Sequence, residues 1–126
     1  MRDFFLICLA GAFGTGARYA VSNVATTFLG ARFAVGTLAV NLLGCLLIGV
    51  MVALGSDLIP APMRGALMLG FLGAFTTFST FGYETFHYFE GGDWKLAVAN
   101  IAANLLLGLL AVGGGLALGR GLLSLV

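Results

Sequence analysis

Four long apolar runs, separated by short polar turns, make up almost the whole chain. Each run provides the roughly 20 apolar residues that an α-helix needs to cross a bilayer. The pattern therefore predicts four membrane-spanning helices, over residues 4–29, 33–54, 63–89 and 94–118. No stretch outside these runs is long enough to form a separate soluble module, so we expect one all-α integral membrane domain over residues 1–126.

The turns between the runs contain the residues that end helices. Asp57, Pro60 and Pro62 separate the second and third runs, and "EGGD", residues 90–93, separates the third and fourth. Met1 and Arg2 precede the first apolar run, as in a signal peptide, but the run continues well past the length of a signal peptide without a convincing cleavage site. We therefore expect residue 1 to be retained.

Composition agrees with this pattern. The chain is 60% apolar and only 9% charged, with a mean hydropathy of +1.09. No packed core could hide that much apolar surface, which excludes an ordinary soluble domain. A net charge of +1 provides no basic surface for nucleic acid.

The cations are almost evenly divided between the two sides of the membrane. Because an even number of spans puts both termini on one side, Arg2, Arg64 and Arg120 flank one face, and Arg32 and Lys95 flank the other. The positive-inside rule therefore favours neither orientation strongly. The side chain of Arg18, inside the first run, can snorkel toward either the terminus or a protein cavity, so it does not decide the orientation. This balance favours insertion in both orientations (dual topology), although a single orientation set by a weak bias is equally compatible with it.

Size and glycine content indicate an oligomer. Four helices of this length enclose very little by themselves, and a solute path needs a lining of protein or water. Many of the 20 glycines lie inside the apolar runs, where they allow helix backbones to approach closely. We therefore expect tight helix packing and a homo-oligomer.

Polar side chains recur at helical spacing inside two of the runs. Thr37 and Asn41 share one face of the second helix, and Asn100 and Asn104 share one side of the fourth. A single membrane asparagine can serve only as a hydrogen bond between helices. Three asparagines together with a hydroxyl cluster favour a polar path that they line.

The hydroxyl cluster lies in the third run, in "GFLGAFTTFSTF", residues 70–81. Gly70 and Gly73 are followed there by Thr76, Thr77, Ser79 and Thr80. Hydroxyl residues compete for backbone hydrogen bonds, so the pattern predicts a broken third helix. Carbonyl oxygens freed by such a break are good ligands for a hard cation such as Na⁺.

Phe78 and Phe81 lie among these hydroxyls and project from nearly one helix face. The edge of an aromatic ring carries positive potential, so ring edges and hydroxyls can together solvate an anion without a fixed positive charge. Simple packing explains two phenylalanines equally well. If they do line a path, the combination suits a small, strongly hydrated anion.

Three motifs together resemble the Fluc (CrcB) family of small bacterial fluoride channels: "GTGARY" at 14–19, "GTLAVNLLG" at 36–44 and "GFLGAFTTFSTF" at 70–81. The resemblance covers essentially the whole chain. It implies an antiparallel, dual-topology homodimer in the bacterial cytoplasmic (inner) membrane. It also implies two fluoride pathways per dimer, and passive export of fluoride that confers fluoride resistance.

The resemblance also implies roles for individual residues. Phe78 and Phe81 are similar to the phenylalanines that contact fluoride, Asn41 to the pore asparagine, and Ser79 and Thr80 to hydroxyls of the polar track. The backbone carbonyls of Gly73 and Thr76, from both subunits, are similar to those that hold a structural Na⁺ at the dimer centre. Arg18 is similar to an arginine near the aqueous vestibule, where a cation attracts anions.

The fourth run departs from the family pattern. Many members have Tyr and Ser where this chain has Asn100 and Asn104, although both amides can still donate hydrogen bonds. Glu84 would be costly against lipid; it either faces the aqueous mouth of the pathway or snorkels at the helix end.

Two other functional classes stay open at this point. A small proton-coupled multidrug exporter, also dimeric and dual in topology, would need a carboxylate deep in the membrane; the first two runs have none after Asp3, and Glu84 is the one candidate. A membrane scaffold would use its asparagines and glycines only for packing, and predicts neither a broken third helix nor ion flux.

An enzyme is not expected, because the chain has no Ser/His/Asp set, no His/Cys metal cluster and no phosphate-binding loop of known pattern. Cys8 and Cys45 fall within apolar runs and are expected to be buried cysteines that act as small hydrophobes. His87 lies near Tyr83 and Tyr88 and is expected to belong to an interfacial aromatic belt.

Overall fold

The computed structural model describes residues 1–125, with the backbone alone at Ser56 and Asp57. Within the described residues, the elements are all helical, and four helices are long and apolar enough to cross a membrane. The spans are Arg2–Leu29, Val35–Gly55, Ala61–Glu90 and Trp94–Leu123. The prediction of a four-span, all-α membrane chain is confirmed.

The first two spans are single helices, and the last two are divided into several elements. The first and second are α1 (Arg2–Leu29) and α2 (Val35–Leu58), the latter kinked at Gly55. The third consists of α3 (Ala61–Gly65), the π-helix η1 (Ala66–Leu72), α4 (Gly73–Phe75) and α5 (Phe78–Glu90). The fourth consists of α6 (Trp94–Ala102), the π-helix η2 (Ala103–Leu107) and α7 (Gly108–Leu123).

Several helices begin or end at other residues than the apolar runs predict. The first helix includes Arg2 and Asp3, because an acidic residue in the first turn favours the helix N-terminus. The second begins only at Val35, after a loop that starts at Gly30, whose φ of 86° suits glycine. The fourth continues past Leu118 to Leu123.

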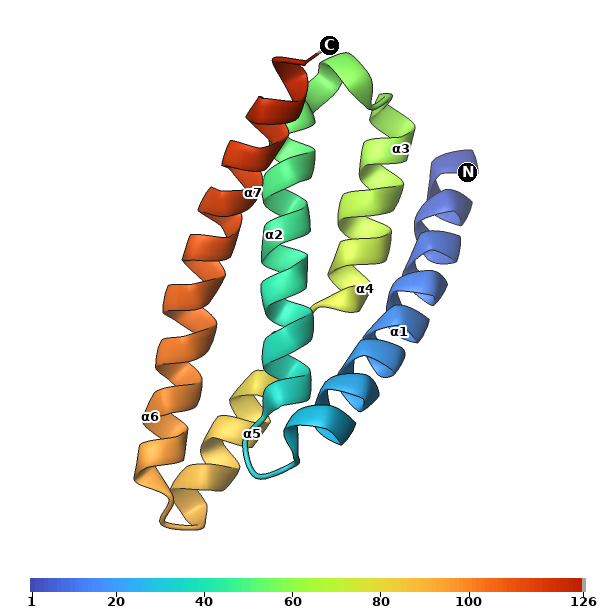
Figure 1. Cartoon of the computed structure of the whole chain (residues 1–126). Coiled ribbons are helices and arrows are strands. Elements are labelled where there is room, and N and C mark those ends of the chain that lie inside the picture. Colours follow the sequence, from blue (N-terminus) through green and yellow to red (C-terminus); the bar gives the residue numbers. More distant parts are fainter. Residues whose placement is uncertain (126) are drawn as a thin grey trace.

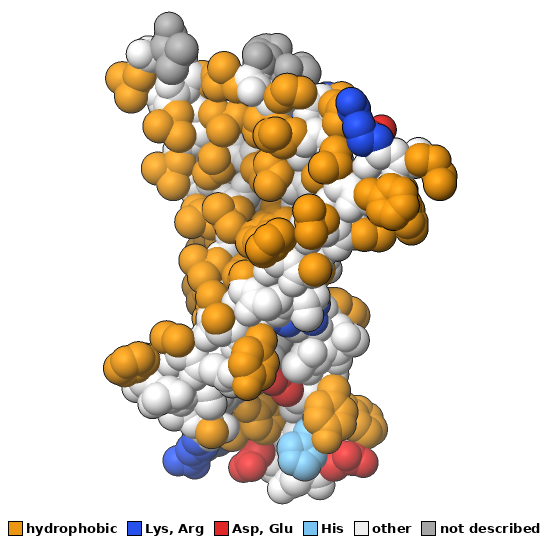
Figure 2. All heavy atoms as spheres, turned by 90° about the vertical axis from the view of Figure 1, so that its right-hand side faces the viewer, with side chains coloured by type: hydrophobic (Ala, Val, Ile, Leu, Met, Phe, Trp, Pro, Cys, Tyr) orange, Lys and Arg blue, Asp and Glu red, His pale blue; other side chains and the backbone are white. Residues whose placement is uncertain are grey.

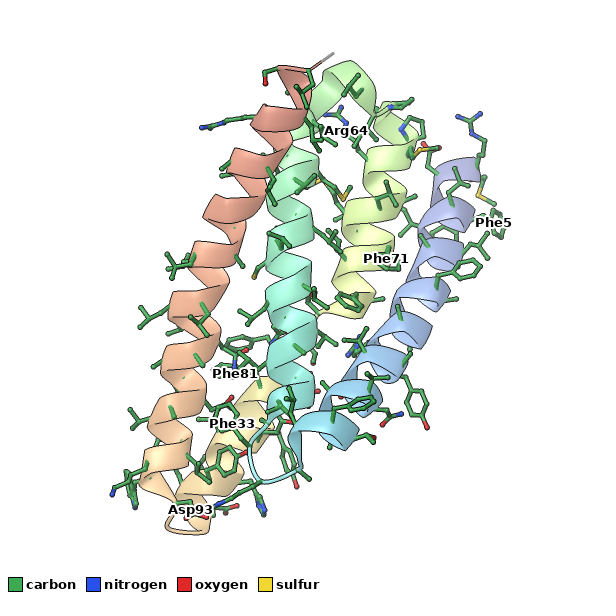
Figure 3. All side chains as sticks on the ribbon, in the orientation of Figure 1. Phe5, Phe33, Arg64, Phe71, Phe81 and Asp93 are labelled. Carbon is green, nitrogen blue, oxygen red and sulfur yellow. The ribbon has the colours of Figure 1, made fainter. Side chains whose placement is uncertain are left out.

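The four spans run alternately up and down, and both termini lie at the same end of the molecule (Figure 1). Arg64 lies at this end and Asp93 at the opposite end (Figure 3). Apolar side chains cover much of the surface between the ends, and most of the charged side chains in view lie toward the ends, with a few between them (Figure 2). The division of cations between two faces, inferred from the sequence, therefore holds in the fold.

Most large apolar side chains lie on the outside of the bundle, as expected where lipid is the solvent. Phe28, for example, is 82% exposed. The buried apolar residues are few and lie where the spans meet; they are Ala34, Val40, Leu72, Phe75, Phe81 and Ala97. Lipid is as apolar as the helix surfaces, so the hydrophobic effect does not bring the helices together in a bilayer. Close packing and hydrogen bonds must therefore hold the spans together.

Glycines provide this close packing between α2 and α7. A Cβ atom at Gly115 would overlap the carbonyl oxygen of Leu46, and one at Gly49 would overlap that of Val112. Each helix therefore places a glycine against the backbone of the other. The tight packing expected from the glycine content is present at this contact.

The third span changes its packing partner halfway along. Elements η1 and α4 pack against α1, whereas α5 packs against α6 on the other side of α2 (Figure 1). The chain makes this change at Thr76 and Thr77, between α4 and α5. The polar site described below is built around these two residues.

A substitution at Gly115 tests the close approach of α2 and α7. Gly115→Ala would push a methyl group into backbone atoms, which cannot rotate away, and we expect it to destabilise the fold by about 1–3 kcal/mol. Gly113→Ala is the matched control, since a Cβ there meets no atom within 4 Å. Thermal unfolding of the purified protein in detergent measures the difference. Equal unfolding midpoints for the two variants would contradict this packing.

Candidate functional site

The third span is interrupted by two residues with extended backbone. Thr76 has φ −82° and ψ 160°, and Thr77 has φ −149° and ψ 115°. The side chain of Thr76 takes part in ending α4, because its Oγ1 and its backbone N–H both donate to the Leu72 carbonyl, at 3.0 Å each. This competition by a hydroxyl for a helix carbonyl is what the Thr/Ser-rich sequence predicts.

One asparagine side chain binds both backbone groups of Thr77. The Thr77 N–H, which a continuous helix would direct to the Gly73 carbonyl, donates to Asn41 Oδ1 at 2.9 Å. Asn41 Nδ2 in turn donates to the Thr77 carbonyl at 3.1 Å. Asn41 thus replaces the missing helix partners of Thr77.

Hydroxyl groups surround the start of α5. Thr77 Oγ1 accepts the Thr80 N–H at 3.2 Å and caps the helix. It also lies 2.9 Å from Thr80 Oγ1 and 3.3 Å from Ser79 Oγ. Among the described residues, no group accepts a hydrogen bond from the N–H of Phe78 or Ser79. The start of α5 therefore presents unused donors beside a hydroxyl cluster.

Arg18 binds the end of α4 from the neighbouring helix. Its Nε donates to the Ala74 carbonyl at 2.7 Å, and its Nη2 donates to the same oxygen. A cation suits this position because the C-terminal end of a helix is negative. The guanidinium also lines a cavity of about 350 Å³ together with Asn23 and Thr80. Arg18 therefore connects this cavity to the interruption.

Other carbonyls at the end of α4 keep free lone pairs. Within the described part of the chain, no hydrogen bond reaches the carbonyl oxygen of Gly73 or of Thr76. Gly73 is exposed on the surface of the chain. These two oxygens, and that of Phe75, which accepts no hydrogen bond within the described residues either, remain for an external ligand.

The two phenylalanines of the motif have opposite environments. Phe78 is 81% exposed and Phe81 only 8% exposed, with ring centroids 5.4 Å apart. Phe81 lies between α2 and the fourth span (Figure 3). A cavity of about 350 Å³ brings together several of the residues singled out in the sequence, but not Ser79 or Thr80; it is lined by Asn41, Gly73, Thr76, Thr77, Phe78, Phe81 and Asn104.

Asn104 and Asn100 differ in their access to this cavity. Asn104 lines it and accepts a hydrogen bond from Asn41 Nδ2 at 3.0 Å. Asn100 is fully buried, with 0% exposure, and donates to Thr85 Oγ1 at 2.9 Å. Thr85 was not a candidate from the sequence. The signal that could have found it is its hydroxyl, which lies four residues after Phe81 and therefore on the same helix face.

Glu84 and Thr37 form a separate pair. Thr37 Oγ1 donates to Glu84 Oε1 at 2.7 Å, while Oε2 is buried without a hydrogen-bond partner. Both residues line a cavity of about 290 Å³ between α1, α2 and α5, together with Ser22 and Thr26. Glu84 thus points into the protein, and the alternative of a carboxylate snorkelling at the helix end does not describe it.

The remaining candidates are simpler. His87 is exposed and stacks on Tyr83, with ring centroids 6.1 Å apart. Both cysteines are free thiols. The expectation of burial was wrong for Cys8, which is exposed because it lies on the outer face of α1; Cys45 is half-buried. The described residues contain no group of three or more His, Cys, Asp or Glu that could hold a metal.

These features define a multi-pass membrane protein whose third span carries a polar interruption. Residues 5–116 match the family model described as "CrcB-like protein, Camphor Resistance (CrcB)". Because the match covers most of the chain, the protein belongs to the CrcB family. The family resemblance drawn from the three sequence motifs is confirmed.

Curated relatives align with the chain over nearly its whole length. The "Fluoride-specific ion channel FluC" of Dehalococcoides mccartyi is 46% identical over 114 residues, which are 89% of this chain and 88% of the relative. The same name belongs to a Maridesulfovibrio salexigens protein, 38% identical over 126 residues, 98% of this chain and 100% of the relative. A Chloroflexus aurantiacus protein of that name is 40% identical over 122 residues, 95% and 97% of the two chains. These relatives are named as ion channels and not as enzymes.

Removing the guanidinium of Arg18 tests its role at the end of α4. Arg18→Met keeps the apolar stem but leaves the Ala74 carbonyl without its donors, so we expect a loss of about 1–3 kcal/mol in stability. Arg18→Lys retains the charge with fewer donors and should lose less. Chemical denaturation in detergent, followed by circular dichroism, measures both. Arg120→Met, at an exposed position, is the control, and an Arg18→Met protein as stable as that control would disprove the role.

Proposed function

We propose that this protein is a fluoride-selective channel that passes F⁻ passively across the membrane and so protects the cell from fluoride. The name and similarity of the curated relatives support the choice of ion. The observation that carries the proposal for this chain is the start of α5, where unused N–H donors and hydroxyls lie beside two phenylalanine rings.

The chemistry of this site suits a small anion. Fluoride is strongly hydrated, so a channel must replace its water with hydrogen-bond donors. The N–H groups of Phe78 and Ser79 lie at the positive end of α5, and the hydroxyls of Ser79 and Thr80 add further donors. The rings of Phe78 and Phe81 offer positive edges. Fluoride is thereby solvated without a lysine or arginine that would bind it too tightly to leave.

We further propose that two chains form an antiparallel homodimer with two pathways. Gly73, Phe78 and Thr80 are exposed on the single chain, although they lie near the middle of the third span. Polar backbone and hydroxyls at that depth are tolerated only against protein or water. A second copy would cover them, and the near-equal division of cations between the two ends favours an inverted orientation.

A Na⁺ ion is the proposed structural cofactor of this dimer. The Gly73 and Thr76 carbonyls, which accept no hydrogen bond within the described residues, are hard oxygen ligands at the negative end of α4. Their counterparts in an inverted partner would complete the ligand set at the dimer centre. Bound there, Na⁺ would neutralise the carbonyl dipoles of both chains, which otherwise repel each other and the anion.

The other candidates take places along the proposed pathway. Asn41 and Asn104 line the cavity next to Phe81, and both hydrogens of each amide are donated to protein oxygens, so these residues shape the polar wall of the pathway. Arg18 faces the aqueous approach as the vestibule cation, with some N–H groups not directed at Ala74. Thr37 and Glu84 form the polar wall of a neighbouring cavity, and Thr37 also lines the cavity of Arg18. Asn100, the last pathway candidate from the sequence, is fully buried.

Fluoride efflux from liposomes, followed with a fluoride electrode, tests the function. We expect Phe81→Ile and Asn41→Asp each to lower the initial rate at least about tenfold, the first by removing a ring edge and the second by replacing an amide donor with an anion. Chloride-loaded vesicles should retain their anion, which measures selectivity.

The control for this experiment is Phe28→Ile, the same chemical change at a ring that is 82% exposed near the end of α1. It should conduct like the wild type. If folded wild-type protein released no fluoride, the result would contradict a fluoride channel and favour the exporter or the scaffold. If fluoride passed equally through all the variants, the pathway would lie elsewhere.

Cysteine labelling in spheroplasts tests the dual topology. In a protein with Cys8→Ala and Cys45→Ala, Ser124→Cys places one exposed thiol near the C-terminus. A membrane-impermeant maleimide should label about half of the chains from outside, since the cation bias is small, and the rest only after permeabilisation. Labelling of nearly all chains, or of almost none, would show a single orientation.

A further inference from the structure

Five hydrogen bonds run head to tail from the interruption into the fourth span and back to α5. The Thr77 N–H donates to Asn41 Oδ1 at 2.9 Å, and Asn41 Nδ2 donates to Asn104 Oδ1 at 3.0 Å. Asn104 Nδ2 donates to Asn100 Oδ1 at 3.1 Å, and Asn100 Nδ2 donates to Thr85 Oγ1 at 2.9 Å. Thr85 Oγ1 donates to the backbone carbonyl of Phe81 at 2.7 Å.

The direction of this chain is determined by its two ends. A backbone N–H can only donate, so Thr77 orients the amide of Asn41. A backbone carbonyl can only accept, so the Phe81 carbonyl receives the hydroxyl hydrogen of Thr85 at the other end. Turning any one of the three amides around would place two donors or two acceptors against each other. The three asparagine orientations are therefore set together and not one by one.

Burial makes the links at Asn100 and Thr85 costly to break. Asn100 is 0% exposed and Thr85 is 7% exposed, so neither can exchange a lost partner for water. In a low-dielectric interior, consecutive hydrogen bonds of the same sense also strengthen one another. A substitution at Thr85 should consequently weaken the hydrogen bonding of Thr77, at the other end of the three amides.

We propose that Asn104, Asn100 and Thr85 form a positioning relay, which holds the amide of Asn41 in the one orientation that binds both backbone groups of Thr77. Because Thr77 caps α5 and Thr85 binds the Phe81 carbonyl, the relay aligns the start of α5 and the ring of Phe81 with respect to α2. This inference rests on the proposed function. It assigns Thr85 and Asn100 a role in conduction without contact with the ion.

A direct role for Asn100 as an ion ligand makes different predictions. A side chain that touches the passing anion would change the half-saturating fluoride concentration or the selectivity when replaced, and Thr85 would not matter. A positioning relay predicts that the maximal flux falls, that selectivity is kept, and that Thr85 and Asn100 act as one unit. The burial of both residues favours the relay.

The test compares Thr85→Val with Thr85→Ser. Valine has the shape of threonine without the hydroxyl, and we expect it to lower the maximal fluoride efflux rate about tenfold while the half-saturating concentration stays within about twofold. Serine keeps the hydroxyl and should restore most of the rate. Asn100→Leu should lower the rate by a similar factor, and the double variant with Thr85→Val should be no worse than either single one.

A second readout does not depend on fluoride. Hydrogen exchange of the Thr77 amide, measured by NMR in micelles, should accelerate at least about fivefold in Thr85→Val and little in Thr85→Ser. Thr15→Val is the matched control: it removes a hydroxyl that donates to a carbonyl four residues earlier, as Thr85 does, but outside the relay. It should leave the exchange of the Thr77 amide unchanged.

The outcomes separate this inference from the proposed function. If the wild type conducts and Thr85→Val conducts equally well with an unchanged Thr77 amide, the relay is wrong. Additive losses in the double variant, or a changed half-saturation in Asn100→Leu, would make Asn100 an ion ligand instead. If the wild type conducts no fluoride but Thr77 exchange responds to Thr85→Val, the relay stands as a structural unit and the proposed function fails.

Discussion

The hydrogen bond from the Thr77 N–H to Asn41 is the interaction on which the rest of the site depends. In an unbroken helix this N–H would bind the Gly73 carbonyl. Its transfer to Asn41 frees the Gly73 oxygen on one side and orients three asparagine amides on the other. A membrane interior has no water to satisfy an interrupted backbone, so the helix can open only where another span supplies a partner of matching geometry.

The interruption creates two helix ends of opposite polarity within a few residues of each other. The end of α4 is negative and is partly neutralised by Arg18, whereas the start of α5 is positive and keeps unused N–H groups beside hydroxyls. A cation site and an anion site can thus adjoin each other without a cluster of charged side chains. Gly73 and Phe78 are exposed on the single chain, and the proposed second copy would cover them in the bilayer.

Polar side chains in this protein divide into those that satisfy the backbone and those that are left for a ligand. Arg18 and Asn41 are directed largely at carbonyl and N–H groups of the third span, whereas the family resemblance implied a vestibule and a pore for them. Asn100 is entirely enclosed. Hydrogen-bond partners decide between these roles, and helical spacing does not reveal partners on other spans.

The four spans, their alternating direction and the place where the third one opens follow from the amino-acid sequence, because apolar length and hydroxyl content act locally along the chain. The ends of the spans were less predictable, since residues such as Arg2 and Asp3 are polar yet helical. The pairing of Thr77 with Asn41, the pairing of Thr37 with Glu84 and the place of Thr85 at the end of a chain of amides emerge only in the folded chain. Each of these pairs joins residues on different helices, and their distance depends on how the spans pack, which no local pattern records.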